Sequence, residues 1–255
     1  MLSLVVCFLA GLGAGLGTGF AGMSAAAVIS PMLITFLDVP PYEAVGIALA
    51  SDVLASAASA WTYQRHRNLD IRNGLIMMVF VLLFTLVGSY ASSLMPESTM
   101  SGFSIVMTLL LGIRFLVKPV NAPRSLLDRL TPRGRIFCTA ACGGVVGFIC
   151  GFVGAGGGMM MLLVLTSVLG YELKTAVGTS VFIMTFTALT GAASHFVIGG
   201  APNWLLLILC AVFTLLWAQI AARFANRASS VVLNRVVGTV LTVLAVVMLT
   251  VEYLL

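Results

Sequence analysis

The chain has 255 residues, of which 60% are hydrophobic and only 8% are charged, and its mean hydropathy is +1.14. Soluble domains carry about 25% charged residues. A single aqueous core cannot bury this much apolar surface, so the composition predicts an all-α polytopic membrane protein embedded in a lipid bilayer. At about 20 residues per crossing, the chain has room for about seven to ten spans and for no separate soluble domain.

The net charge of +5 does not indicate a nucleic-acid partner, because the basic residues lie between apolar runs, where they anchor and orient spans. The five cysteines lie in apolar runs and form no CxxC motif. They are interpreted as small packing residues. The sequence therefore predicts neither a metal site nor a cofactor.

Charges and Pro/Gly clusters divide the chain into apolar segments. An uncharged run over 3–37 ends at an acidic turn, and an uncharged run over 136–171 follows a Pro- and Arg-containing stretch at 118–135. The remaining segments predict single spans. These spans cover about 44–63, 73–94, 98–117, 175–197, 203–222 and 231–253.

The runs 3–37 and 136–171 are too long for single crossings. Each would form a helix of about 52 Å, whereas the hydrocarbon core of a bilayer is about 30 Å thick. Glycines interrupt both runs, at 17–22 and at 151–158. We expect each run to form two shorter helices joined by a bend inside the membrane.

The two halves of the chain also match each other. Between 11–72 and 143–204, a constant offset of 132 aligns five glycines, whereas chance would align about 1.5. The same offset aligns Ala44-Val45-Gly46 with Ala176-Val177-Gly178. The chain is therefore divided into a first transmembrane repeat, a cytoplasmic linker and a second repeat, at 1–117, 118–135 and 136–255.

The basic residues indicate how the repeats are related. They cluster at 65–72, 114–135 and 223–235, with Lys174 apart. If all of these face the cytoplasm, the loop 65–72 and its uncharged counterpart 197–204 lie on opposite sides of the membrane. We therefore expect two inverted repeats, each with a glycine-broken helical hairpin followed by three transmembrane helices, and both termini outside.

The bends are the first candidate for a binding site. A helix that begins inside the membrane presents free backbone N–H groups and the positive end of its dipole, which together attract anions. Inverted repeats would aim two such helix starts at one point near the midplane, where transporters bind substrate. The predicted substrate-binding residues there are Gly22, Ser24, Gly154, Gly156, Gly157 and Gly158. Glycines at four-residue spacing are instead expected to allow close helix packing, at Gly11, Gly15, Gly143 and Gly147.

A few polar residues within the spans add to this site. Thr179 and Ser180 carry hydroxyls that either donate to a substrate or bond to their own helix. Asp52 lies in an otherwise uncharged span, where a charge costs about 2.5–3.5 kcal/mol, so it should face the interior or water. Asp52 and His195 are the candidates for proton coupling. The alternatives are a protonated packing carboxyl and a histidine satisfied in the interior or at the interface.

The second half resembles a known family. The segment 151–158 reads GFVGAGGG and is followed about 20 residues later by Ala176-Val177-Gly178-Thr179-Ser180, a pattern similar to that of the TauE/SafE family of sulfite and organosulfonate transporters. The first half keeps Gly19 to Gly22 and Ala44 to Gly46 but has Met23-Ser24-Ala25-Ala26 in place of a glycine run. The resemblance implies transport of small sulfur-containing or carboxylate anions across a bacterial inner membrane.

The function expected from these observations is secondary transport, without nucleotide or catalysis. No HExxH or GxSxG motif is present, and Ser180 lies 15 residues from His195 on one predicted helix, so an enzyme is disfavoured. A negative cell interior drives anions outward, which favours export. The alternative is a proton-coupled carrier of a cation or metal ion that uses Asp52. The partners expected are a small anionic substrate and lipid, with a homodimer left open.

Overall fold

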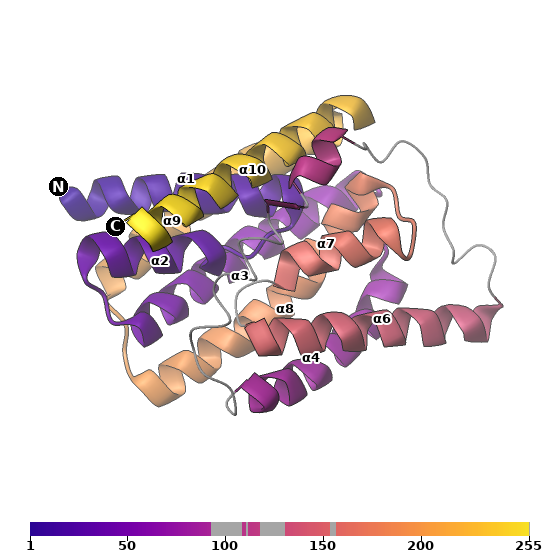
Figure 1. Cartoon of the computed structure of the whole chain (residues 1–255), viewed down its shortest axis with the longest axis horizontal. Coiled ribbons are helices and arrows are strands. Elements are labelled where there is room, and N and C mark those ends of the chain that lie inside the picture. The colour runs from indigo at the N-terminus through magenta and orange to yellow at the C-terminus, as the bar shows by residue number, and fades with distance from the viewer. Residues whose placement is uncertain (93–108, 111, 118–130, 154–156, 255) are drawn as a thin grey trace.

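The computed structural model describes residues 1–92, 109–110, 112–117, 131–153 and 157–254 (Figure 1). These residues form helices joined by short connections, which confirms the all-α class. Outside the short helical piece at 112–117, the helices are α1 (Leu2–Ala21), α2 (Ala26–Leu37), α3 (Pro41–Arg65), α4 (Ile71–Ser92), α6 (Pro132–Val153), α7 (Gly157–Ser167), α8 (Leu173–Gly199), α9 (Trp204–Arg227) and α10 (Ser230–Leu254).

Both long uncharged runs are broken where the glycines predicted. The first breaks at Gly22, which adopts a left-handed conformation with φ of 60° and donates its N–H to the carbonyl of Thr18 at 2.9 Å. Such a C-terminal cap favours glycine because it has no Cβ. The second run divides into α6 and α7, and Gly154 and Gly156 lie outside the described residues. The two hairpins are therefore α1–α2 and α6–α7.

Seven of the described helices are long and apolar enough to cross a membrane. The chain is therefore a multi-pass membrane protein, and its predicted spans 44–63, 73–94, 175–197, 203–222 and 231–253 correspond to α3, α4, α8, α9 and α10. The predicted span at 98–117 lies mostly outside the described residues. The second arms of the hairpins are shorter, with 12 residues in α2 and 11 in α7.

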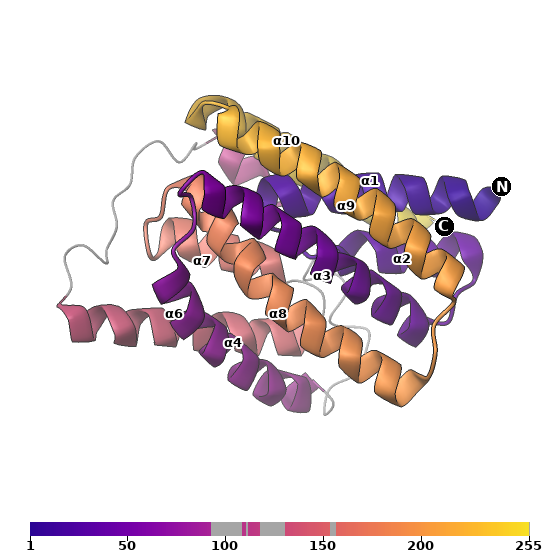
Figure 2. The same ribbon diagram turned by 180° about the vertical axis from the view of Figure 1, so that it is seen from behind.

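Helices from the two halves are interleaved. α3 and α8 lie side by side through the middle of the bundle, as Figure 2 shows, while α1 packs along α9 and α4 packs along α6. The offset of 132 that relates the halves pairs α1 with α6, α3 with α8, and α4 with α9. Each first helix of one half thus packs on the fourth helix of the other half.

The glycines at four-residue spacing make these contacts possible. A methyl group at Gly15 would lie 2.7 Å from the carbonyl oxygen of Thr214 on α9, and one at Gly11 would lie 2.6 Å from Cβ of Phe213. On α6, methyl groups at Gly143 and Gly147 would overlap the backbone of α4 in the same way. The packing interpretation of these four glycines is confirmed.

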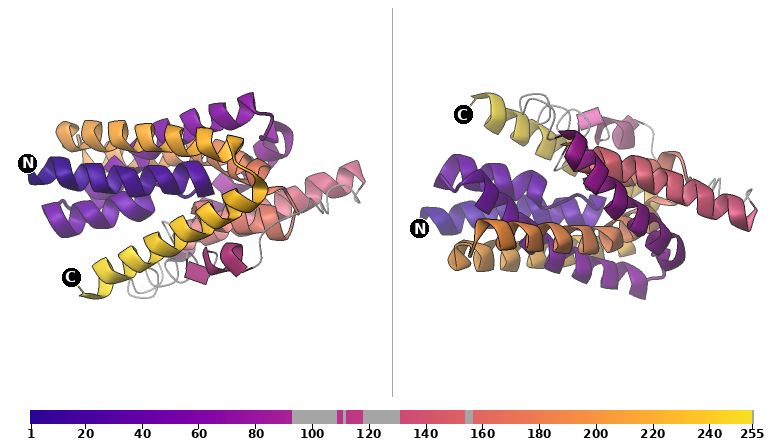
Figure 3. Two further views of the ribbon diagram at one scale, coloured as in Figure 1. Left: turned by 90° about the horizontal axis from the view of Figure 1, so that it is seen from above. Right: turned by 90° about the horizontal axis from the view of Figure 1, so that it is seen from below.

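The two ends of the bundle differ in charge. At one end, Lys174 donates to the carbonyl of Asn226 at 3.1 Å, and Asn68 of the basic loop donates to the Asn226 side chain at 2.7 Å. At the other end, Glu43 accepts from the backbone N–H of Asn203 at 2.7 Å. We call these the basic end and the acidic end. Figures 1 and 3 place the N-terminus and the last turn of α10 at the acidic end.

Candidate substrate site at the helix bends

The two bends meet at Ser180 on α8. Its hydroxyl lies in donor range of two carbonyl oxygens, that of Gly22 in the first bend at 3.2 Å and that of Gly158 in the first turn of α7, just after the second bend, at 3.4 Å. A methyl group at Gly158 would overlap the Gly22 carbonyl, so the two backbones are in direct contact. Bends that follow α1 and α6, at positions 132 residues apart in the sequence, therefore converge on one buried side chain.

The start of α2 is occupied by a carboxylate from the chain itself. Asp52 on α3 is fully buried, and its Oδ2 accepts hydrogen bonds from the Ser24 hydroxyl at 2.9 Å and from the Ala25 N–H at 3.1 Å. Its Oδ1 accepts from the hydroxyl of Ser56, one turn along α3, at 2.8 Å. Asp52 thus accepts one backbone N–H at the start of α2, next to the positive end of the helix dipole, and the Ala26 N–H is accepted by the Ser24 hydroxyl.

This arrangement satisfies the hydrogen bonding of a carboxyl group that is buried inside the bundle. A buried charge without hydrogen bonds is strongly disfavoured, and Asp52 has three donors. Its hydrogen-bond partners in the described part of the chain are hydroxyls and a backbone amide, with no basic side chain among them. Ser56 was not singled out from the sequence, although its i,i+4 spacing from Asp52 was a usable signal.

The second bend has no equivalent carboxylate. The offset of 132 places Met184 where the first half has Asp52, and a methyl group at Gly158 would lie 2.6 Å from the Met184 sulfur. The Ser180 hydroxyl lies 3.9 Å from the same sulfur atom. The start of α7 is therefore bordered by a neutral thioether, while the start of α2 is bordered by a carboxylate.

Two of the predicted residues lie in other surroundings. The hydroxyl of Thr179 accepts from the backbone N–H of Asp70 at 3.2 Å, so it binds the loop at the basic end. The Nδ1 of His195 lies 3.0 Å from the carbonyl oxygen of Tyr42 near the start of α3, and the two rings are in contact with centroids 4.2 Å apart and planes tilted by 37°. Tyr42 lies ten residues before Asp52, about 15 Å along the helix, so His195 belongs to the acidic end.

Of the other predicted site residues, Gly22 and Ser24 lie at the first bend, and Gly157 begins α7. Among the described residues, no group of three His, Cys, Asp or Glu side chains could hold a metal ion. The described cysteines are free thiols. The polar groups that the structure describes at the bends are hydroxyls and a backbone amide as donors, and the Asp52 carboxyl and the Gly22 and Gly158 carbonyls as acceptors.

Comparison with known proteins decides the family. Residues 7–248 match the family described as Sulfite exporter TauE/SafE. The chain belongs to the TauE/SafE family. The match covers both hairpins and nearly every described helix, so it includes the bends as well as the bundle around them.

Curated TauE/SafE relatives carry the same general description. The chain is 29% identical over 224 residues to the probable membrane transporter protein YunE of Bacillus subtilis, covering 80% of this chain and 82% of the relative. It is 26% identical over 240 residues to YdhB of the same organism, a probable membrane transporter protein, covering 92% and 94%. This TauE/SafE chain is thus a member of a family of membrane transporters.

The structure gives separate roles to neighbouring residues of the TauE/SafE motif at 176–180. Gly178 lies against the backbone of the basic-end loop, because a methyl group there would overlap the carbonyl oxygen of Asn68. Thr179 binds the same loop, and Ser180 faces the bends. A single stretch of α8 therefore links the candidate site to one end of the bundle.

Proposed function

We propose that this protein is a secondary transporter that binds small sulfur-containing or carboxylate anions, such as sulfite or organosulfonates, near the midplane between the two bends. The observation that carries this proposal is the convergence of both bends on Ser180. Broken helices that meet at the midplane are typical substrate sites of transporters, since their N-termini hold anionic groups.

The difference between the bends indicates where the substrate's charge is held. Asp52 already accepts from Ser24 and from the amide of Ala25, so an anion at the start of α2 would face a carboxylate. At the second bend the neighbouring side chain is Met184, which carries no charge. We therefore assign the oxyanion to the start of α7, with Gly157, Gly158 and the Ser180 hydroxyl as donors.

Removal of the Ser180 hydroxyl is expected to weaken substrate binding. One hydrogen bond to a charged group contributes about 1.5–3 kcal/mol, so Ser180→Ala should raise the substrate concentration for half-maximal flux by about tenfold or more. The measurement is uptake by proteoliposomes of radiolabelled sulfite, sulfoacetate and nitrate. Ser51→Ala is the matched control, because the Ser51 hydroxyl is equally buried and donates only to its own helix, at Ile47. Equal flux in Ser180→Ala and wild type would place the site elsewhere.

The helix contacts support an inverted relationship between the repeats. α1 packs on α9 and α6 packs on α4, which is the reciprocal exchange expected of two halves related by a two-fold axis. The loop 66–70 contacts the basic end, whereas its counterpart near Gly200 lies beside Glu43 at the acidic end. Two-fold inversion in the membrane plane accounts for both observations.

Labelling from each side of the membrane tests the inversion. Cysteines introduced at His66 and at Ala201, both exposed, are expected to react with a membrane-impermeant thiol reagent from opposite sides. The background should lack the five native cysteines. The positive-inside rule predicts that the His66 position faces the cytoplasm. Reaction of both positions from the same side would contradict the inverted repeat.

We further propose that the transporter exports its substrate across the bacterial inner membrane. A potential that is negative inside drives each negative charge outward with about 2.3 kcal/mol per 100 mV, so a divalent anion leaves without a coupling ion. The candidates for proton coupling, Asp52 and His195, are not needed for this direction. Export uncoupled from protons is thus the simplest mechanism that the charges of the molecule support.

The second candidate function is proton-coupled transport of a cation or metal ion through Asp52. It is favoured by one observation, namely that this buried carboxylate has no basic partner among the described side chains that bind it. A cation that displaced the Ser24 and Ser56 hydroxyls would meet a full negative charge. Transport measurements on Asp52 variants, described in the Discussion, distinguish the two functions.

A further inference from the structure

At the basic end, a loop of the first half packs against a helix of the second half. The loop 66–70 crosses the first turns of α8, where Gly178 leaves room for the carbonyl of Asn68. A Cβ at this position would also lie 2.9 Å from Cβ of Tyr63, so no larger residue fits without moving the loop. Gly178, the glycine of the motif 176–178, is therefore the position at which the loop backbone packs directly against α8.

Hydrogen bonds to three separate elements fasten the loop there. The Asp70 carboxylate accepts from the phenol of Tyr171 at 2.8 Å, and the Asp70 N–H donates to Thr179. Asn68 donates to Asn226 at the end of α9. Burial and the neighbouring Asp70 carboxylate raise the pKa of Tyr171, so its hydroxyl keeps its proton and remains the donor in this bond.

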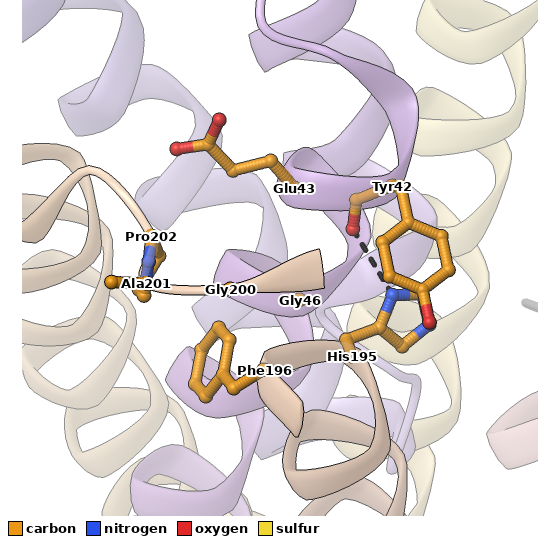
Figure 4. Close-up of a pocket in the computed structure, with 8 residues that line it drawn as sticks. All are labelled: Tyr42, Glu43, Gly46, His195, Phe196, Gly200, Ala201 and Pro202. Atoms are coloured by element: carbon orange, nitrogen blue, oxygen red, sulfur yellow. Dashed lines mark hydrogen bonds between the residues drawn. The ribbon is translucent and has the colours of Figure 1, made fainter. Parts of the chain in front are cut away.

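The acidic end has a corresponding but looser contact. The equivalent glycine, Gly46 on α3, faces side chains of α8, and a Cβ there would lie 3.1 Å from the ring of Phe196 and 3.2 Å from Cβ of His195. The connection from α8 to α9 is held by the N–H of Asn203, which donates to Glu43. A pocket remains beside Gly46, lined by Tyr42, Glu43, His195, Phe196 and the segment 200–202 (Figure 4).

We propose that these two contacts are the gates of the transport pathway. The loop 66–70 on α8 closes the basic end, and the segment 200–203 on α3 closes the acidic end. Each gate joins elements from both halves, so relative movement of the halves opens one and closes the other. In the structure both contacts are formed, through Asp70 and Tyr171 at the basic end and through Glu43 and Asn203 at the acidic end.

The position of the gates relative to the bends supports this assignment. Thr179, which binds the basic-end loop, is adjacent in the sequence to Ser180 at the bends. Gly46 and Asp52 are likewise on one helix, less than two turns apart, about 9 Å along the axis. Both α3 and α8 therefore run directly from a gate to the candidate site. A shift of either helix would change the contacts at its gate and the contacts at the bends together.

The gates are tested by the rate at which a thiol reagent reaches the bends. The proposal rests on the proposed transport function, but this test needs no substrate. A negative result would therefore count against the gates and not against transport. The reporter is Ser180→Cys in a background free of native cysteines, and the probe is a small impermeant methanethiosulfonate applied to inside-out or right-side-out vesicles. The vesicle side is identified by the reactivity of a cysteine at His66. Because one bond to the charged Asp70 is lost, Tyr171→Phe should speed labelling from the basic end by about tenfold.

Variants at both gates make the test specific. Gly178→Ala should also speed labelling from the basic end, because its methyl group displaces the loop. Glu43→Gln, which weakens the bond to Asn203, should speed labelling from the acidic end instead. Tyr42→Phe is the matched control and should change neither rate, since Tyr42 binds His195 through its ring and carbonyl. Unchanged basic-end labelling in Tyr171→Phe and Gly178→Ala, or basic-end acceleration in Glu43→Gln, would overturn the proposal.

Discussion

Replacement of Asp52 by alanine is expected to destabilise the protein by about 1–3 kcal/mol, because it leaves the buried amide of Ala25 without an acceptor. The hydroxyls of Ser24 and Ser56 also lose their partner, although each can rotate towards a backbone carbonyl. Asp52→Asn should cost less, since its amide oxygen can still accept from Ala25. The measurement is the unfolding temperature in detergent, which should fall from wild type to Asp52→Asn and again to Asp52→Ala.

The same variants decide between the two candidate functions. If the protein exports anions without protons, flux through Asp52→Asn in proteoliposomes should continue and should follow an imposed membrane potential. The start of α2 would still be capped, and the oxyanion would bind at α7. Flux that instead follows a pH gradient, ignores the potential and is lost in Asp52→Asn would contradict uncoupled export and favour the proton-coupled carrier.

Gly147→Ala is expected to be among the most destabilising single substitutions in the described helices. Its methyl group would overlap the carbonyl oxygen of Val81 and lie 2.8 Å from the Val81 Cα, so α4 and α6 would have to separate. Overpacking of this kind costs about 1–3 kcal/mol and more where only backbone can yield. The measurement is the unfolding temperature of the purified protein in detergent.

Gly144→Ala on the same helix is the matched control. A methyl group there would lie 3.4 Å from the ring of Phe84, an ordinary van der Waals contact. Because alanine favours a helix over glycine by about 1 kcal/mol, Gly144→Ala should leave the protein equally or more stable. A Gly147→Ala protein as stable as Gly144→Ala would show that the close approach of α4 and α6 is not required.

Some features followed from the sequence because they depend on composition and local backbone chemistry. The shortage of charge required the bilayer as solvent, and the glycines at 17–22 required a break, since an uninterrupted helix of that length exceeds the membrane. The break at Gly22 lies within that stretch. The four-residue spacing of Gly143 and Gly147 likewise predicted close packing, because a helix presents such residues on one face.

The partners of these features were decided only by the tertiary structure. Nothing in the sequence links Ser24 in the first bend to Asp52, 28 residues away on α3. Ser24 was predicted to contact substrate, and the structure adds that its hydroxyl donates to the Asp52 carboxyl. Thr179 and Ser180 are adjacent in the sequence but face a loop and the bends respectively, because consecutive residues point about 100° apart around a helix. The local pattern determines which groups need partners, whereas the packing of helices distant in sequence determines which partners they meet.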